Sequence, residues 1–206
     1  MSIRNIRLKW SIGFNLGLRL ISILITFISV PLLLSYLGKE KYGIWLTIFS
    51  FVGWLNMFEL GLGQGLRLKL TEAFSKKRIH DVQLYISTFY VFFTVVGFGV
   101  ICLFLLIDSN VNWHEILGIE SFSPIEINLA ILILTISFLL ILILKNIGII
   151  FSALQLPFID NIIKTSSQLL FLSFIALFIF FGIQSSLVLV SIVSILPLLV
   201  LYLIFT

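Results

Sequence analysis

The sequence predicts an all-α integral membrane protein, a bundle of six transmembrane helices. Hydrophobic residues make up 60% of its 206 residues and charged residues only 11%, and the mean hydropathy is +1.22. A soluble domain has about 25% charged residues. Residues 20–38 and 129–144 carry no charge at all. Runs of this length favour helices, because a membrane barrel would show alternating short segments.

Six apolar segments are each long enough to cross a hydrocarbon layer of about 30 Å. We expect one domain over residues 1–206, with spans at approximately 11–36, 43–66, 82–107, 127–151, 160–181 and 187–206. The polar stretch from Arg67 to Asp81 is predicted to contain a short helix at the membrane surface, and Pro157 to lie near the start of the fifth span.

The distribution of basic residues predicts that both termini are cytoplasmic. With the N-terminus inside, most cations fall in inner segments. These are Arg4, Arg7, Lys9, Arg67, Lys69, Lys76, Lys77, Arg78 and Lys164. The outer segments hold Lys39 and Lys41, and the outer loop 108–126 carries acids only. The basic clusters beside helix ends match anionic lipid headgroups, so the net charge of +4 gives no reason to expect nucleic-acid binding.

Two opposite charges, Arg19 and Glu59, lie at similar distances from the turn that separates the first two spans. If this turn joins antiparallel helices, both charges lie at one depth. A charge at that depth costs roughly 2.5 to 3.5 kcal/mol and normally has a partner or faces a watery cavity. We therefore expect an Arg19–Glu59 pair. The alternative is that Arg19 lies among the inner headgroups, with residues 20–38 forming the span.

Polar residues also align on single helix faces. At about 100° per residue, six of them share a narrow arc of the first helix: Ser11, Asn15, Arg19, Ser22, Thr26 and Ser29. The fifth span places Asp160, Lys164 and Ser167 on one stripe, with the acid four residues before the base. Such stripes predict a polar seam inside the bundle. The alternative is ordinary close packing through small and hydroxylated residues.

Two further residues are candidates for a polar cavity. Lys145 lies near the inner end of the fourth span, where a lysine can also snorkel to the surface. Gln155 lies between the fourth and fifth spans. The glycine run Gly61 to Gly65 follows no strand and does not predict a nucleotide loop. His80 and His114 fall on opposite sides of the membrane. The sequence therefore gives no reason to expect an enzyme, a metal or a cofactor.

Three stretches carry a resemblance to a known family: residues 15–32 (NLGLRLISILITFISVPL), the turn 36–45 (YLGKEKYGIW) and residues 58–67 (FELGLGQGLR) with the inner loop that follows. The chain resembles the bacterial polysaccharide biosynthesis flippases. These form the O-antigen and exopolysaccharide repeat-unit branch of the multidrug/oligosaccharidyl-lipid/polysaccharide exporter superfamily. The resemblance covers about the first 80 residues, and the remainder agrees in hydropathy.

The resemblance implies the N-terminal lobe of a MATE-like two-lobed transporter, with the C-terminal lobe absent. Such a transporter moves undecaprenyl-pyrophosphate-linked oligosaccharide across the bacterial inner membrane by alternating access. The substrate cavity is then expected to include Arg19, Glu59, Asn15, Lys145 and Gln155. Other expected partners are membrane lipid, a coupling ion, and the polymerase and other assembly proteins.

Three other functions remain open. An ion-coupled drug exporter of the same superfamily would want a carboxylate in the first helix, where this chain has Arg19. A polytopic enzyme such as an oligosaccharide polymerase would normally have a larger outer loop. A non-transporting scaffold of a polysaccharide assembly complex is the third.

Overall fold

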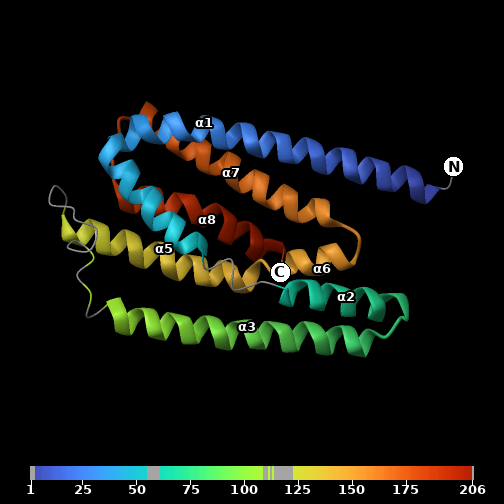
Figure 1. Ribbon diagram of the computed structural model, residues 1–206. Coiled ribbons are helices and arrows are strands. Elements are labelled where there is room, and N and C mark those ends of the chain that lie inside the picture. Colours follow the sequence, from blue (N-terminus) through green and yellow to red (C-terminus); the bar gives the residue numbers. More distant parts are fainter. Residues whose placement is uncertain (1–2, 55–60, 109–110, 112, 114–122, 206) are drawn as a thin grey trace.

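The regular secondary structure in the described part of the chain is all helical, which confirms the all-α class. The computed structural model describes residues 3–54, 61–108, 111, 113 and 123–205, and contains no strand among them. The helices are α1 (Ile3–Trp54), α2 (Leu62–Ser75), α3 (Ile79–Asp108), α5 (Pro124–Leu144), α6 (Ile147–Ala153), α7 (Pro157–Phe180) and α8 (Leu187–Phe205) (Figure 1).

A glycine reverses the direction of α1. Gly38 has φ 76° and ψ 167°, a conformation outside the helical range that residues with a Cβ rarely adopt. The two arms of α1 meet at this point and diverge from it in a V (Figure 1). The turn predicted around residues 36–43 is therefore where the first helix ends and the next begins.

Five described stretches are long and apolar enough to cross a membrane, by length and composition. They are Gly13–Ser50, Ile79–Asp108, Pro124–Ala153, Pro157–Phe180 and Leu187–Phe205. The chain is thus a multi-pass helical membrane protein. The first stretch contains the reversal at Gly38, and the expected total of six spans stays a prediction.

One predicted boundary needs correction. The second span was expected to run through residues 43–66, but Gly61 has φ 85° and precedes the separate helix α2. A left-handed glycine interrupts the helical hydrogen-bond pattern, so 62–66 belong to α2 instead. The fourth span, expected at 127–151, falls within the stretch Pro124–Ala153, which has a turn at Lys145 and Asn146 between α5 and α6. By contrast, Pro157 occupies the first turn of α7 as expected.

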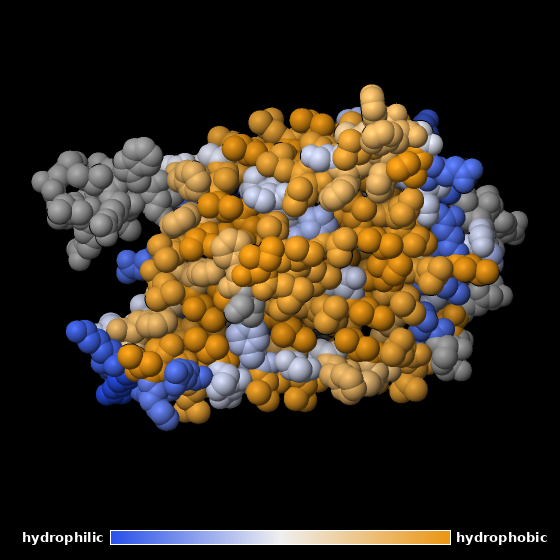
Figure 2. Space-filling view, turned by 180° about the vertical axis from the view of Figure 1, so that it is seen from behind, coloured by the Kyte–Doolittle hydropathy of each residue, from blue (hydrophilic) through white to orange (hydrophobic). Residues whose placement is uncertain are grey.

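The core lies where α5 packs against α8 and where α1 and α8 pack against α7. Its fully buried side chains include Ile127, Leu134, Leu187, Val190 and Tyr202. Other large apolar side chains are exposed, as expected for a surface that faces lipid. In Figure 2 they form a broad apolar belt, with hydrophilic residues gathered toward the two ends of the molecule.

Polar contacts fix the turn of α1 to the connection between α7 and α8. The Tyr36 hydroxyl donates to the Gln184 carbonyl at 2.9 Å, and Lys41 Nζ donates to the Ser185 carbonyl at 2.8 Å. Glu126 accepts a hydrogen bond from the Leu187 backbone N–H at 2.7 Å, and its Oε1 lies 3.5 Å from Lys41 Nζ. Four elements therefore meet at this end of the bundle, which we call the end cluster.

Candidate substrate cavity

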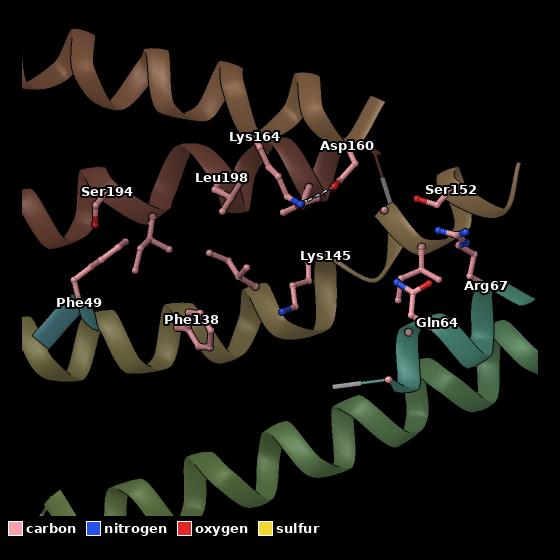
Figure 3. A pocket seen from close by; sticks show the side chains of 17 residues that line it. Phe49, Gln64, Arg67, Phe138, Lys145, Ser152, Asp160, Lys164, Ser194 and Leu198 are labelled. Carbon is pink, nitrogen blue, oxygen red and sulfur yellow. Dashed lines mark hydrogen bonds and ion pairs between the residues drawn. The ribbon is translucent and has the colours of Figure 1, made fainter. Parts of the chain in front are cut away.

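A cavity of about 640 Å³ opens between α2, α5, α6, α7 and α8, with Phe49 of α1 at its edge. Its lining combines apolar side chains such as Phe138 and Leu198 with a group of polar and charged ones (Figure 3). The polar and charged residues are Gln64, Arg67, Lys145, Ser152, Asp160, Lys164, Ser194 and Tyr202. We call this space the basic cavity, because three of its described lining residues are cationic and one is acidic.

Asp160 joins α7 to α8 at the basic cavity. Its Oδ2 accepts a hydrogen bond from Lys164 Nζ at 2.7 Å, and its Oδ1 accepts one from the Tyr202 hydroxyl at 2.9 Å. Asp160 lies in the first turn of α7, where a carboxylate is favoured by the helix dipole, and Lys164 follows one turn later.

Gly148 lets the Asp160 carboxylate lie directly against α6. A Cβ at this position would be 2.7 Å from Asp160 Oδ1 and 2.8 Å from Cγ, well inside normal contact. Gly148 is buried, whereas the Asp160 side chain keeps 17% of its surface exposed. The carboxylate therefore packs against Gly148 of α6 on one side and faces the cavity on the other.

The two other cations come from different helices. Lys145 is half-buried and directly follows α5, and Arg67 is exposed on α2 (Figure 3). Arg67 shares α2 with Leu66 and Leu70, which are buried against α3 and α6 and so fix the exposed face of α2 toward the cavity. The arrangement offers charged N–H donors from three elements to an anion that enters the cavity.

A second cavity of about 600 Å³ lies between α1 and α7, and we call it the amide cavity. It is lined by Asn15, Leu16, Leu18, Arg19, Ser22, Asn161, Lys164, Thr165 and Gln168. Asn161 Nδ2 donates to Asn15 Oδ1 at 2.7 Å, and the Ser22 and Thr165 hydroxyls are 2.9 Å apart. Lys164 lines both cavities.

The predicted polar face of the first helix is thus seen in part, with Asn15, Arg19 and Ser22 lying together against α7. Of the five predicted site residues, Lys145 lines the basic cavity, and Asn15 and Arg19 line the amide cavity. Gln155 lies exposed in the turn between α6 and α7, with φ 62°, and lines neither cavity. Glu59 lies outside the described residues, so the Arg19–Glu59 pair stays a prediction.

The sequence prediction of the site left out Asp160, Lys164, Arg67 and Tyr202. A signal existed for the first two, because their spacing of four residues places them on one stripe of an apolar helix. Arg67 was visible as a cation beside the glycine run. Tyr202 gave no signal, since its contact with Asp160 joins positions 42 residues apart and depends on how α7 and α8 pack.

Comparisons with known proteins give one partial relative. No protein-family profile and no solved structure match the chain. A stretch of 55 residues is 42% identical to a Yersinia pseudotuberculosis protein named "Putative O-antigen export protein". This chain is similar in part to that protein. The stretch covers 27% of the chain and 13% of the relative, so the chain matches only a small share of the relative's length.

Proposed function

We propose that the chain is the N-terminal lobe of a MATE-like flippase that moves undecaprenyl-pyrophosphate-linked oligosaccharide repeat units across the bacterial inner membrane. The product would feed O-antigen or exopolysaccharide synthesis. The observation that carries the proposal is the basic cavity, in which Arg67, Lys145 and Lys164 line one space in a bundle of membrane helices. The partial likeness to a protein named for O-antigen export supports the same class of cargo.

The substrate has two parts with opposite needs. Its pyrophosphate is anionic and strongly hydrated, whereas its polyprenyl tail is stable in hydrocarbon. A cavity that supplies charged donors replaces part of the lost hydration, while the tail stays in lipid. Arginine binds phosphate in a bidentate way and lysine acts as a point charge, so both residue types suit this role.

Asp160 would act as the internal counter-ion of Lys164 when the cavity is empty. Arrival of a pyrophosphate offers Lys164 another anion, and binding then favours whichever conformation allows that exchange. This exchange of anions at Lys164 would couple alternating access to substrate binding. The proposed Arg19–Glu59 pair would lie beside the amide cavity, and exchange with substrate or a coupling ion would break it.

The transporter would work with a second lobe, a coupling ion and other proteins of the assembly pathway. Both termini of the chain would be cytoplasmic, a second lobe would complete the transporter, and a coupling ion would drive it. The polymerase and other assembly proteins would act on the transported product, and the chain itself would catalyse no reaction.

A second candidate is an ion-coupled drug exporter of the same superfamily, and Asp160 is the observation that favours it. A carboxylate in a cavity can bind a lipophilic cation. The three cations that line the same cavity oppose this function, because they repel such a substrate. A non-transporting scaffold of an assembly complex would not need the basic cavity to bind a substrate.

Binding to the purified chain in nanodiscs tests the proposal. The probes are undecaprenyl pyrophosphate and uncharged undecaprenol. We expect the pyrophosphate to bind at least tenfold more tightly, and Lys145→Met and Arg67→Met each to weaken it about tenfold, equal to about 1.4 kcal/mol. Lys39→Met, which removes an exposed cation at the turn of α1, is the matched control and should have no effect.

Two outcomes would contradict the proposal. Equal affinity for the two lipids would show that the cavity does not recognise the anion. Binding of tetraphenylphosphonium that is lost in Asp160→Asn, without binding of the pyrophosphate, would favour the drug exporter.

A further inference from the structure

The amide cavity differs in chemistry from the basic cavity. Its polar lining consists of two asparagines, a glutamine, a serine, a threonine and two cations, with no acid among the described lining residues. Thr165 is 4% exposed and Ser22 is half-buried, so the hydroxyls lie within the helix interface. A volume of about 600 Å³ falls in the usual range of ligand pockets, roughly 300 to 1,000 Å³.

Gln168 gives the amide cavity a hydrogen-bond acceptor that the contact between α1 and α7 does not use. The Asn15–Asn161 and Ser22–Thr165 contacts already join α1 to α7. Gln168 Oε1 is buried and has no hydrogen-bond partner among the described residues. A buried acceptor without a donor costs about 1 to 3 kcal/mol, so this oxygen is available to a ligand that brings an O–H or N–H group.

The combination of groups narrows the class of ligand. A phosphate only accepts hydrogen bonds and could serve Arg19 and Lys164, but not Gln168 Oε1. A hydroxyl donates and accepts, so it satisfies both an amide oxygen and a cationic N–H. The lining of the amide cavity therefore suits a polyhydroxylated group better than a second anion.

The two cavities are adjacent on one face of α7. At about 100° per residue, Lys164 is rotated by about 40° from Asp160, Gln168 by about 80° and Thr165 by about 140°. Lys164 lies between the acid of the basic cavity and the amides of the neighbouring one, and it lines both. A ligand with its charged part in one cavity can therefore extend into the other beside Lys164.

We propose that the amide cavity is a sugar subsite, which binds the hydroxyl groups of the first saccharide units while the attached pyrophosphate occupies the basic cavity. This inference rests on the proposed function and adds to it the residues that recognise the sugar. Gln168 accepts from a sugar hydroxyl, and Arg19 donates to sugar oxygens. Asn161 contributes its amide at the inner end of the subsite.

The test compares two forms of one lipid. Sugar-bearing polyprenyl pyrophosphates are extracted from the source bacterium, and undecaprenyl pyrophosphate serves as the sugar-free form. We expect the chain in nanodiscs to bind the sugar-bearing form at least tenfold more tightly. Gln168→Met should remove most of this advantage and leave affinity for the sugar-free lipid within twofold. Its thermal stability should not fall, because the substitution removes an unsatisfied buried oxygen.

Controls separate this inference from its alternatives. Ser173→Ala should change neither affinity, because Ser173 is an exposed residue of α7 whose hydroxyl donates to the Leu169 carbonyl in its own helix. Gln168→Ala serves as a second variant if Met is not accommodated. Equal loss for both lipid forms, no advantage of the sugar-bearing form in the unaltered chain, or equal competition by phosphatidylglycerol vesicles would each overturn the sugar subsite. If neither form binds, the proposed function fails as well.

Discussion

At the scale of residues, Gly148 is a position of the basic cavity where an added Cβ would clash with a charged side chain. Gly148→Ala places a methyl group 2.7 Å from Asp160 Oδ1, so either the carboxylate or α6 must move. We expect a loss of about 1 to 3 kcal/mol in the free energy of unfolding, typical of overpacking. Thermal unfolding of the detergent-solubilised protein measures this loss.

Gly99→Ala on α3 is the matched control, because a Cβ there meets nothing within 4 Å. It should leave the melting temperature unchanged or raise it slightly, since alanine favours a helix over glycine. Equal melting temperatures for the two variants would show that Gly148 is not needed for the position of Asp160.

The sequence predicted residue positions well where a single helix determined them. Asn15, Arg19 and Ser22 share a face because of helical periodicity alone, and they lie on one cavity. Gln155 shows the limit of this approach. It was chosen as a polar residue near an inner helix end, yet it lies in a tight turn with positive φ and is exposed. Such turn geometry depends on how the flanking helices pack.

At the scale of elements, Glu126 joins the start of α5 to the start of α8. The first N–H groups of a helix lack partners within the helix. A carboxylate there accepts a hydrogen bond from such an N–H group and interacts favourably with the positive end of the helix dipole. Glu126→Ala removes this bond to Leu187 N–H and the contact with Lys41, and we expect it to cost about 1.5 to 3 kcal/mol in thermal unfolding. Glu126→Gln keeps an acceptor and should cost less than half as much.

Glu40→Ala is the control for the end cluster, because Glu40 is an exposed acid in the same turn as Lys41. It should shift the melting temperature little. If Glu126→Ala behaves like Glu40→Ala, the end cluster does not hold α5 and α8 together.

Helix ends followed from the sequence only where a residue forces them. Pro157 suits the first turn of α7, and Gly38 allows the reversal within its turn. The turn at Lys145 and Asn146 is flanked by apolar residues on both sides, and hydropathy did not show that the helix is interrupted there. The buried Asn146 amide bonds to the Leu142 carbonyl there, a local contact that the sequence pattern does not specify.

At the scale of the whole molecule, the structure combines an apolar surface with polar spaces inside. The exposed belt in Figure 2 suits lipid, and the helices beneath it line two cavities that share Lys164. Hydropathy predicted the membrane class, but it did not identify which helices are neighbours. That α1 packs on α7, and α5 on α8, is a result of side-chain fit between segments distant in sequence.

Translocation is the central claim, and it can be measured in proteoliposomes that contain the complete gene product. The sugar-bearing polyprenyl pyrophosphates extracted from the source bacterium are placed in the inner leaflet, and a lectin outside reports their arrival in the outer leaflet. We expect the protein to raise the rate at least tenfold over protein-free liposomes. The double variant Lys145→Met/Lys164→Met should lose most of that increase, while Lys39→Met should keep it. A rate equal to that of protein-free liposomes, or full activity in the double variant, would contradict the account.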